Sequence, residues 1–271
     1  MATKKAVSKS VKTSAKKPTV TAKTSTVKAV RATGRSTLVS SALKKAPFIG
    51  TLVAEFIGTF LLAVAFITGQ GQPIIILFAI AGIVLLVGTL SGAHINPAVT
   101  IASWLSRRIS GLRALGYVAA QFLGALAALG LLNAFIGGAP AVDATAQLYG
   151  QSAPSLFEAT ALPADKEWYV FFAEMVGALV LGFAMATALR GKRDRVVSAL
   201  TVGFGVFIAL LLAATAASYV SGSAVLNPAV ALSLNALKWE VWPLAVYVLA
   251  PIIGAVAGFF LQGLLRAEND N

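Results

Sequence analysis

Two long runs without a single charged side chain constrain this chain more than any other feature. No Asp, Glu, Lys or Arg occurs from Phe56 to Ser106, or from Val196 to Leu237. A membrane-spanning helix needs about 20 apolar residues, so each run is too long for one span. Charged residues make up 12% of the whole chain and hydrophobic ones 58%, whereas soluble domains average about 25% charged residues. The chain is therefore predicted to be an all-α membrane protein.

Shorter apolar stretches complete a pattern of six spans. We expect these spans at about 47–68, 74–90, 113–136, 168–189, 196–217 and 242–265. The two long runs each leave a surplus apolar segment, 97–105 and 228–237, and each segment opens with Asn-Pro. Asn favours the N-cap and Pro the first helical position, while a helix of about nine residues covers only about half of the hydrocarbon core. Each segment is therefore predicted to be a half-helix that enters the membrane and returns.

Basic residues near the spans gather on alternate connections. Arg107, Arg108 and Arg113 lie between the first half-helix and the third span, and four more basic residues lie within 190–195. The 137–167 loop instead carries four acidic residues and one lysine. The positive-inside rule therefore predicts that the arginine-rich connections and both termini face the cytoplasm of a multi-pass plasma-membrane protein.

The N-terminal tail, residues 1–46, holds the entire formal net charge of +12, because the remainder carries equal numbers of basic and acidic residues. The tail lacks apolar periodicity and is predicted to be disordered. One interpretation is a solvated cytoplasmic tail; others are adhesion to anionic lipid, with each lysine worth about 1 kcal/mol, and a cleaved transit peptide. Nucleic-acid binding is not expected, because no base-reading module accompanies the charge. The membrane domain would occupy 47–265, followed by a short cytoplasmic C-terminus, 266–271.

Several sequence patterns recur in the same order, which indicates an internal duplication. The second copy, about 168–265, contains three spans, as does the first, about 47–136, so it must insert upside down. In such inverted repeats the site lies near the membrane midplane. The matching pairs are Glu55-Phe56-Ile57-Gly58 with Glu174-Met175-Val176-Gly177, Ser91-Gly92 with Ser221-Gly222, Asn96-Pro97-Ala98-Val99 with Asn227-Pro228-Ala229-Val230, and Tyr117 with Gly124-Ala125 against Tyr247 with Gly254-Ala255.

The two Asn-Pro-Ala motifs, Asn96-Pro97-Ala98 and Asn227-Pro228-Ala229, carry the predicted mechanism. A single Asn-Pro is an ordinary turn opener, but turns alone do not explain two copies at equivalent positions of an apolar duplication. Inverted symmetry brings both half-helix N-termini to the bilayer centre, each with about half a positive charge. Cations, including hydronium, meet a barrier there that neutral molecules do not. The amides of Asn96 and Asn227 can also donate to a passing oxygen and so interrupt proton hopping.

The sequence resembles the major intrinsic protein family, the aquaporins and aquaglyceroporins, over about 47–265. The resemblance implies an aquaporin-like inverted repeat of six transmembrane helices plus two re-entrant half-helices, with one pore per subunit and usually a homotetramer. The implied function is a passive channel for water or small neutral solutes such as glycerol, which excludes protons and ions. The resemblance rests on Ala54 to Phe60, Ser91 to Thr100, Tyr117 with Gln121 and Gly124-Ala125, and Tyr247 with Pro251 and Gly254-Ala255.

Glu55 and Glu174 lie inside predicted spans, and an intramembrane carboxylate is a functional candidate by default. The family resemblance implies instead that they accept hydrogen bonds from the re-entrant loops, whose backbone N–H groups otherwise lack partners in lipid. A proton relay is the alternative, although the spans contain no further ionisable partner for it. His94 is likewise interpreted as a loop brace, with pH gating as the alternative.

The outer selectivity filter departs from the family pattern. The resemblance places it at Ile76, at Thr215 (or Ala214, since the second loop is one residue longer), at Ala224 and at Val230. The family normally has an arginine where this chain has Val230, and aromatic or histidine residues at other filter positions. We therefore expect a wider, less polar constriction that admits glycerol-sized neutral solutes as well as water. A hydrophobic ring that dewets and closes is the opposing interpretation.

The sequence fits two other function classes less well than a channel. An ion-coupled secondary transporter also uses inverted repeats and broken helices, but it needs an ion or proton site at the midplane, for which only Glu55 and Glu174 are available. A membrane enzyme is disfavoured, because the spans hold no nucleophile–base pair. With no cysteine and one histidine in the chain, neither a metal site nor a cofactor is expected.

Overall fold

The computed structural model describes residues 36–139, 148, 150, 152–190 and 194–267, and in these ranges the chain is helical without strands. Within them, six helical segments are long and apolar enough to cross a membrane, which confirms the expected number of spans. The elements are α1 Ser36–Thr68, α2 Pro73–Ser91, α3 Pro97–Leu105, α4 Gly111–Gly137, α6 Glu167–Ala188, α7 Arg195–Ser218, α8 Pro228–Ser233, α9 Val241–Leu244, the π-helix η1 Ala245–Leu249 and α10 Ala250–Ala267.

The ends of two elements differ from the prediction. Helix α1 begins at Ser36, so residues 36–46, which we assigned to a disordered tail, are helical. These residues include good helix formers (Ala, Leu and Lys) and continue directly into the first span; residues 1–35 lie outside the described ranges. Helix α8 ends at Ser233 rather than at 237, because Asn235 takes a left-handed conformation with φ 54°. The second half-helix is therefore shorter than the first.

The last span is interrupted by a π-turn. Its three consecutive parts are α9, η1 and α10, and Pro251 lies at the second residue of α10. Proline has no N–H to donate to the carbonyl four residues earlier, and its ring crowds that carbonyl. A local widening of the helix to i→i+5 bonding accommodates this defect. The matching residue of the first repeat is Gln121, and α4 stays regular there.

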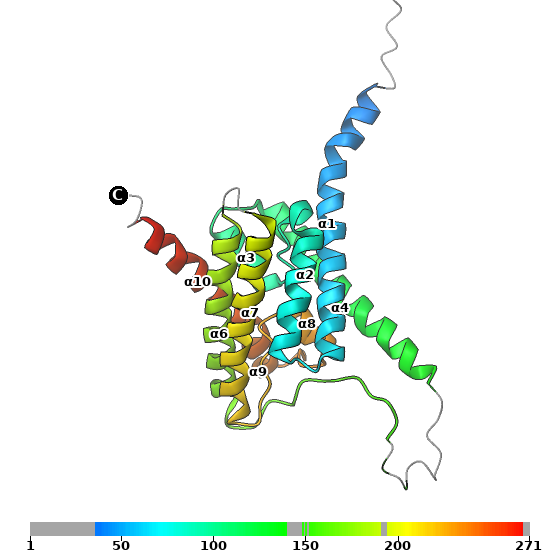
Figure 1. Cartoon of the computed structure of the whole chain (residues 1–271), viewed down its shortest axis with the longest axis vertical. Helices are drawn as coiled ribbons and strands as arrows, with labels where there is room; N and C mark the ends of the chain where they lie inside the picture. Colours follow the sequence, from blue (N-terminus) through cyan, green and yellow to red (C-terminus); the bar gives the residue numbers. More distant parts are fainter. Residues whose placement is uncertain (1–35, 140–147, 149, 151, 191–193, 268–271) are drawn as a thin grey trace, which may run out of the picture. The chain divides into compact units, whose positions relative to one another are not determined.

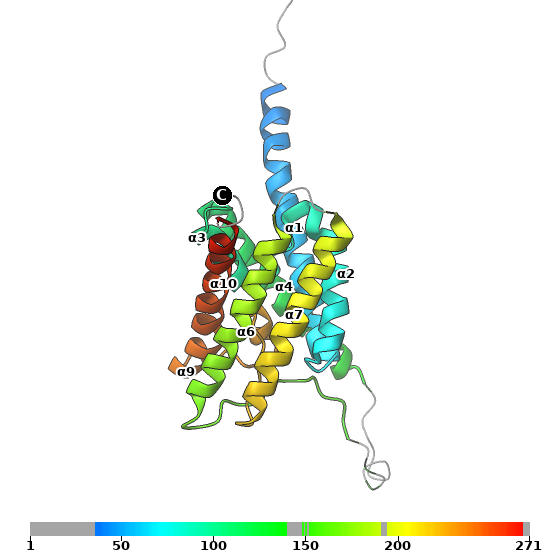
Figure 2. The same cartoon turned by 60° about the vertical axis from the view of Figure 1, so that its left-hand side comes forward.

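The helices form one bundle around the two half-helices. Helix α7 lies between α6 and α2, as Figures 1 and 2 show, and it contacts both. Helix α10 packs along α6 and against α3, while α4 contacts both α3 and α8. The half-helices α3 and α8 also contact each other. Residues from both repeats therefore meet at the centre of the bundle.

Glycines allow equivalent helix crossings in the two repeats. A Cβ on Gly124 in α4 would run into the carbonyl oxygen of Phe56 in α1, and a Cβ on Gly254 in α10 would run into that of Met175 in α6. Each contacted carbonyl belongs to the residue directly after the intramembrane glutamate. Such close approach of helix backbones is how membrane helices pack when small residues occupy the interface.

The outward surfaces of the helices are apolar, which fits a lipid surrounding. Large side chains such as Phe78 on α2, Leu115 on α4 and Phe204 on α7 are more than half exposed. At the start of α6, Trp168 packs edge-on against Phe171 and against Trp242 of α9, with ring centroids 5.5 and 5.0 Å apart. Aromatic rings of this kind are enriched where a membrane protein meets the headgroups.

Candidate functional site

Each half-helix begins at an asparagine that caps it. The Asn96 side chain accepts the N–H of Ala98 at 2.8 Å, and that of Asn227 accepts the N–H of Ala229 at 3.1 Å. Pro97 and Pro228 occupy the first helical position in α3 and α8, where the missing N–H costs no hydrogen bond. Ala98 and Ala229 are fully buried behind them. The six residues of the two motifs therefore start both half-helices in the same way.

The residue before each capping asparagine adopts a left-handed backbone. Ile95 has φ 41° and Leu226 has φ 61°, a costly conformation for bulky residues, above all for a β-branched one. Two glycines leave room for these side chains: a Cβ on Gly58 would lie 2.5 Å from the Ile95 side chain, and one on Gly177 would lie 2.7 Å from that of Leu226. The surrounding packing therefore holds both loops in a strained conformation, as often occurs at functional sites.

Two buried carboxylates hold the strained loops. Glu55 accepts the N–H groups of His94 at 2.9 Å and of Ile95 at 2.7 Å. Glu174 accepts those of Val225 at 2.6 Å and of Leu226 at 2.9 Å. Both carboxylates are fully buried, and hydrogen bonds to charged acceptors contribute about 1.5–3 kcal/mol each. In each repeat one glutamate thus satisfies two loop N–H groups that lipid could not.

The asparagine amides link the two repeats across the centre. Asn96 donates an Nδ2–H to the carbonyl oxygen of Leu226 at 2.8 Å, and Asn227 donates one to that of Ile95 at 2.9 Å. Each loop carbonyl is therefore held by the opposite motif. Because an Asn amide carries two N–H donors, each side chain retains a second N–H. Both asparagines border the same hollow, so these remaining donors are available to a solute there.

Further side chains support the loops in ways that the sequence analysis did not assign. Gln121 donates from Nε2 to Glu55 at 2.7 Å and to the Thr100 hydroxyl at 2.9 Å. The phenol of Tyr117 donates to the Ser91 carbonyl at 3.0 Å, and in the second repeat Tyr247 donates to the Ser223 carbonyl at 3.2 Å. The repeated Tyr signal was visible in the sequence. The pairing with loop carbonyls was not, because it joins residues far apart in the chain.

His94 occupies the first loop close to the centre. Its ring is buried and meets the Tyr117 ring edge-on at 5.4 Å between centroids. The ring also borders the central space, while its backbone N–H binds Glu55. Its Nδ1 has no hydrogen-bond partner among the described residues. His94 therefore binds Glu55 through its backbone N–H and lies beside the hollow that contains the two asparagines.

Three hollows share lining residues and so follow one another through the bundle. The Phe157 hollow, of about 150 Å³, lies beneath the 152–160 segment. The central hollow, of about 20 Å³, contains the two asparagines. The Arg195 hollow, of about 260 Å³, lies near the start of α7. Phe66 and Val225 border both the Phe157 hollow and the central one, and Val202 borders both the central hollow and the Arg195 one.

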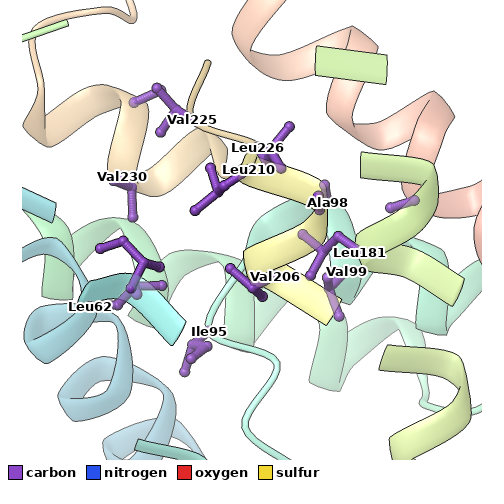
Figure 3. Packing of buried hydrophobic residues seen from close by; sticks show 14 of the residues in the cluster. Leu62, Ile95, Ala98, Val99, Leu181, Val206, Leu210, Val225, Leu226 and Val230 are labelled. Carbon is purple, nitrogen blue, oxygen red and sulfur yellow. The ribbon is translucent and has the colours of Figure 1, made fainter. Parts of the chain in front are cut away.

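The lining of the central hollow is largely apolar. Figure 3 shows several of these side chains packed together, among them Leu62, Val206 and Leu210. Asn96, Asn227 and His94 contribute the polar side chains among its described lining residues. No Asp, Glu, Lys or Arg is among those residues. The arrangement can therefore pass a neutral molecule but offers a charged one no ligand to replace its hydration shell.

The residues expected at the selectivity filter lie in different surroundings. Ala224 borders the Phe157 hollow, and so does Ala214, the alternative to Thr215. Thr215 itself is exposed on the outside of α7. Ile76 and Val230 are fully buried, and neither is among the lining residues of the three hollows. The bordering residues that sequence reasoning missed, Phe66 above all, look like ordinary core residues in the sequence.

Basic side chains gather where α3, α6 and α10 end. The Arg108 guanidinium donates to the Ala186 carbonyl at 3.1 Å and lies 4.9 Å from the centre of the Phe259 ring. Arg190 donates to the Gln262 carbonyl at 3.3 Å. Partial burial lowers the pKa of the Arg108 guanidinium, and the nearby charges of Arg190 and Arg266 lower this pKa further. One end of the bundle is therefore positively charged.

Comparisons with known proteins agree with this architecture. Residues 42–262 match the model of the family described as Major intrinsic protein. The chain is 32% identical over 237 residues to "Aquaporin NIP1-1" of Zea mays, which covers 82% of this chain and 77% of the relative. It is 29% identical over 228 residues to "Glycerol uptake facilitator protein-like 6" of Lactiplantibacillus plantarum, with 83% and 98% covered. The solved aquaglyceroporin of Plasmodium falciparum superimposes with a TM-score of 0.63 at 20% identity and covers 82% of this chain and 99% of its own. That structure supports the fold.

Proposed function

This chain belongs to the major intrinsic protein family and is a passive membrane channel for water or small solutes, not an enzyme, and from that premise we propose its route, its solutes and its setting. The route runs through the Phe157 hollow, the central hollow and the Arg195 hollow. The observation that carries this proposal is that Asn96 and Asn227, from opposite repeats, border one central hollow.

Ion exclusion follows from the same arrangement. The N-termini of α3 and α8 meet at the centre, where aligned peptide dipoles leave partial positive charge. The remaining amide hydrogens of Asn96 and Asn227 donate to the oxygen of a passing molecule. A water held in this way cannot pass a proton along the file, and a cation is repelled. Neutral solutes experience neither barrier.

We assign water and small neutral solutes of about the size of glycerol as the substrates. Support comes from the small side chains of Ala214 and Ala224 beside the Phe157 hollow. Val230, which stands where the family normally has an arginine, is buried away from the three hollows and places no charged group beside the route. Removing an arginine frees volume and deletes hydrogen-bond donors. Among the relatives, one is named an aquaporin and another a glycerol uptake facilitator, so both kinds of solute occur among similar proteins.

The setting is the plasma membrane, with both termini in the cytoplasm. Arg107, Arg108 and Arg195 lie at one end of the bundle and Glu158 and Asp165 at the other, which fits the positive-inside rule. A homotetramer, usual in the family, would cover part of the exposed apolar surface. The basic tail, 1–46, would then face anionic lipid on the cytoplasmic side.

Stopped-flow measurements on proteoliposomes test the function. Water, glycerol and urea are compared in parallel, with protein-free liposomes of the same lipid as the background. We expect water and glycerol fluxes above background that rise linearly with the concentration gradient and ignore proton and sodium gradients. Saturation, or dependence on an ion gradient, would instead indicate the coupled transporter; the absence of flux above background would contradict a channel.

A further inference from the structure

The passage between the Phe157 hollow and the central hollow is bordered by two apolar side chains. Phe66 at the end of α1 and Val225 in the second loop each border both hollows, and they are 3% and 2% exposed. The hollow on one side measures about 150 Å³ and the one on the other about 20 Å³. A solute that moves from the wide space to the narrow one therefore passes beside these two side chains.

Both side chains are held in place by their backbones. The N–H of Val225 donates to Glu174 at 2.6 Å, so the loop cannot retreat without breaking a buried hydrogen bond. The Phe66 carbonyl accepts the N–H of Gly71 at 2.9 Å, which closes the turn after α1. Gly71 has φ +66°, and a Cβ built there would lie 3.5 Å from the Phe157 ring and 4.0 Å from the Phe66 ring. The turn is thus packed between two aromatic side chains.

The 152–160 segment is in turn bonded to the second half-helix region. The N–H of Ala159 donates to the Leu234 carbonyl, and the N–H of Thr160 donates to the Ser223 hydroxyl, both at 3.0 Å. Phe157, which borders the Phe157 hollow, is carried by this bonded segment. The segment that carries Phe157 is therefore bonded, through Ser223, to the same loop that carries Val225.

None of the positions at which the family has its filter borders both the Phe157 hollow and the central hollow. Ile76 and Val230 have no exposed surface and border none of the three hollows. Ala214 and Ala224 border the wide Phe157 hollow, but not the central one. Their methyl groups project little into that space. A phenylalanine ring is the largest group at the boundary.

We propose that Phe66 and Val225 form the size-limiting neck of this channel, an assignment that rests on the passive transport proposed above. A phenyl ring and an isopropyl group offer no hydrogen bond, so the neck discriminates by the cross-section of the solute. Neutral solutes up to about the size of glycerol pass beside the ring, and bulkier polyols such as xylitol are held back in the Phe157 hollow. The asparagines beyond the neck then supply the hydrogen bonds.

Opposite changes at one position test the neck. Phe66→Ala widens it and Phe66→Trp narrows it, and proteoliposome flux is measured for water, glycerol and xylitol. We expect Phe66→Ala to raise the xylitol-to-water flux ratio several-fold, and Phe66→Trp to lower the glycerol-to-water ratio. Phe78→Ala is the matched control, because that ring is 70% exposed on the outside of α2; its ratios should equal those of the parent. Val225→Ala provides a second widening variant that leaves α1 intact.

The outcomes separate this proposal from the function on which it rests. Parent vesicles without flux above the lipid background contradict the channel itself. If the parent vesicles conduct but the solute-to-water flux ratios are unchanged in Phe66→Trp and Val225→Ala, the proposed neck is wrong and the channel function is not affected. If Phe66→Ala fails to fold, these two variants still decide, since one keeps an aromatic ring at 66 and the other leaves Phe66 in place.

Discussion

Glu55 and Glu174 perform the same task in the two repeats with different numbers of partners. Glu55 receives two backbone N–H groups and the side-chain amide of Gln121, whereas Glu174 receives two backbone N–H groups alone among the described residues. The residue that matches Gln121 is Pro251, which instead lies beside the π-turn. The comparison separates what both loops require, a carboxylate that accepts two N–H groups, from what one repeat can omit, a third donor.

The largest expected effect tests this difference in partners. Glu174→Gln places an amide NH₂ against a loop N–H, and among the described residues Glu174 has no hydrogen-bonded side-chain amide that could turn an oxygen toward it. The lost charge-assisted hydrogen bond and the unsatisfied donors together should cost about 3–5 kcal/mol. In Glu55→Gln, Gln121 can rotate its amide and offer Oε1, which has no hydrogen-bond partner, to the new NH₂. Thermal unfolding in detergent should therefore show a larger loss for Glu174→Gln; a larger loss for Glu55→Gln would contradict this account.

The next effect concerns the glycines that the repeats share. In Gly254→Ala the new methyl group meets the backbone carbonyl of Met175, which cannot move aside without shifting α6. We expect a loss near the upper end of the usual 1–3 kcal/mol for overpacking, or roughly 3 kcal/mol. Gly263→Ala in the same helix is the control, because a Cβ there meets nothing within 4 Å. Equal unfolding temperatures for the two variants would show that the close crossing does not constrain the fold.

Removing the third donor from the first repeat should have a moderate effect. Gln121→Leu leaves Glu55 with the two backbone donors that suffice for Glu174, so the channel should still fold and conduct. The lost hydrogen bond to a charged group should cost about 1.5–3 kcal/mol. Denaturation in detergent and water flux are measured together. Loss of flux in a protein that remains folded would mean that the first loop depends on Gln121 for its function.

The smallest effect is expected at the matching proline. Pro251→Ala restores an N–H and removes the ring that crowds the preceding turn, while it also frees the unfolded chain. Since these changes oppose each other, we expect a change in stability within about 1 kcal/mol of zero. The unfolding temperature of this variant, beside that of the parent, is the measurement. A loss well beyond that range would show that the π-turn is required by the second repeat.

Local sequence signals sufficed for much of the fold. Asn96-Pro97 followed by an apolar run predicted the half-helix 97–105, and α3 has those bounds. The second half-helix ends early, at Ser233, just before Asn235. Asn235 has a left-handed backbone and contacts Glu158, a residue far away in the chain. Such long-range contacts leave no trace in the spacing of residues. The π-turn could have been suspected from Pro251, because a proline inside a span removes a backbone donor.

The lining of the route was harder to predict than its polar centre. The two asparagines could be recognised because their motif occurs twice, whereas Phe66 is one of many apolar residues in its span. A side chain that borders a hollow and one that fills the core have the same composition and the same helical spacing. The choice between Ala214 and Thr215 likewise depended on the rotation of α7, which a one-residue insertion in the following loop does not determine.

Proton leak through asparagine variants tests the central claim that both repeats build one ion-excluding centre. Asn96→Asp and Asn227→Asp each place a carboxylate against the half-helix dipoles, and both side chains border the same hollow. Ser110→Asp, a charge at the exposed N-cap of α4, is the control. With pH-sensitive dye inside proteoliposomes, proton flux relative to water flux should rise in both asparagine variants and stay unchanged in the control. Proton leak equal to that of the parent in both variants, with water flux retained, would contradict the account.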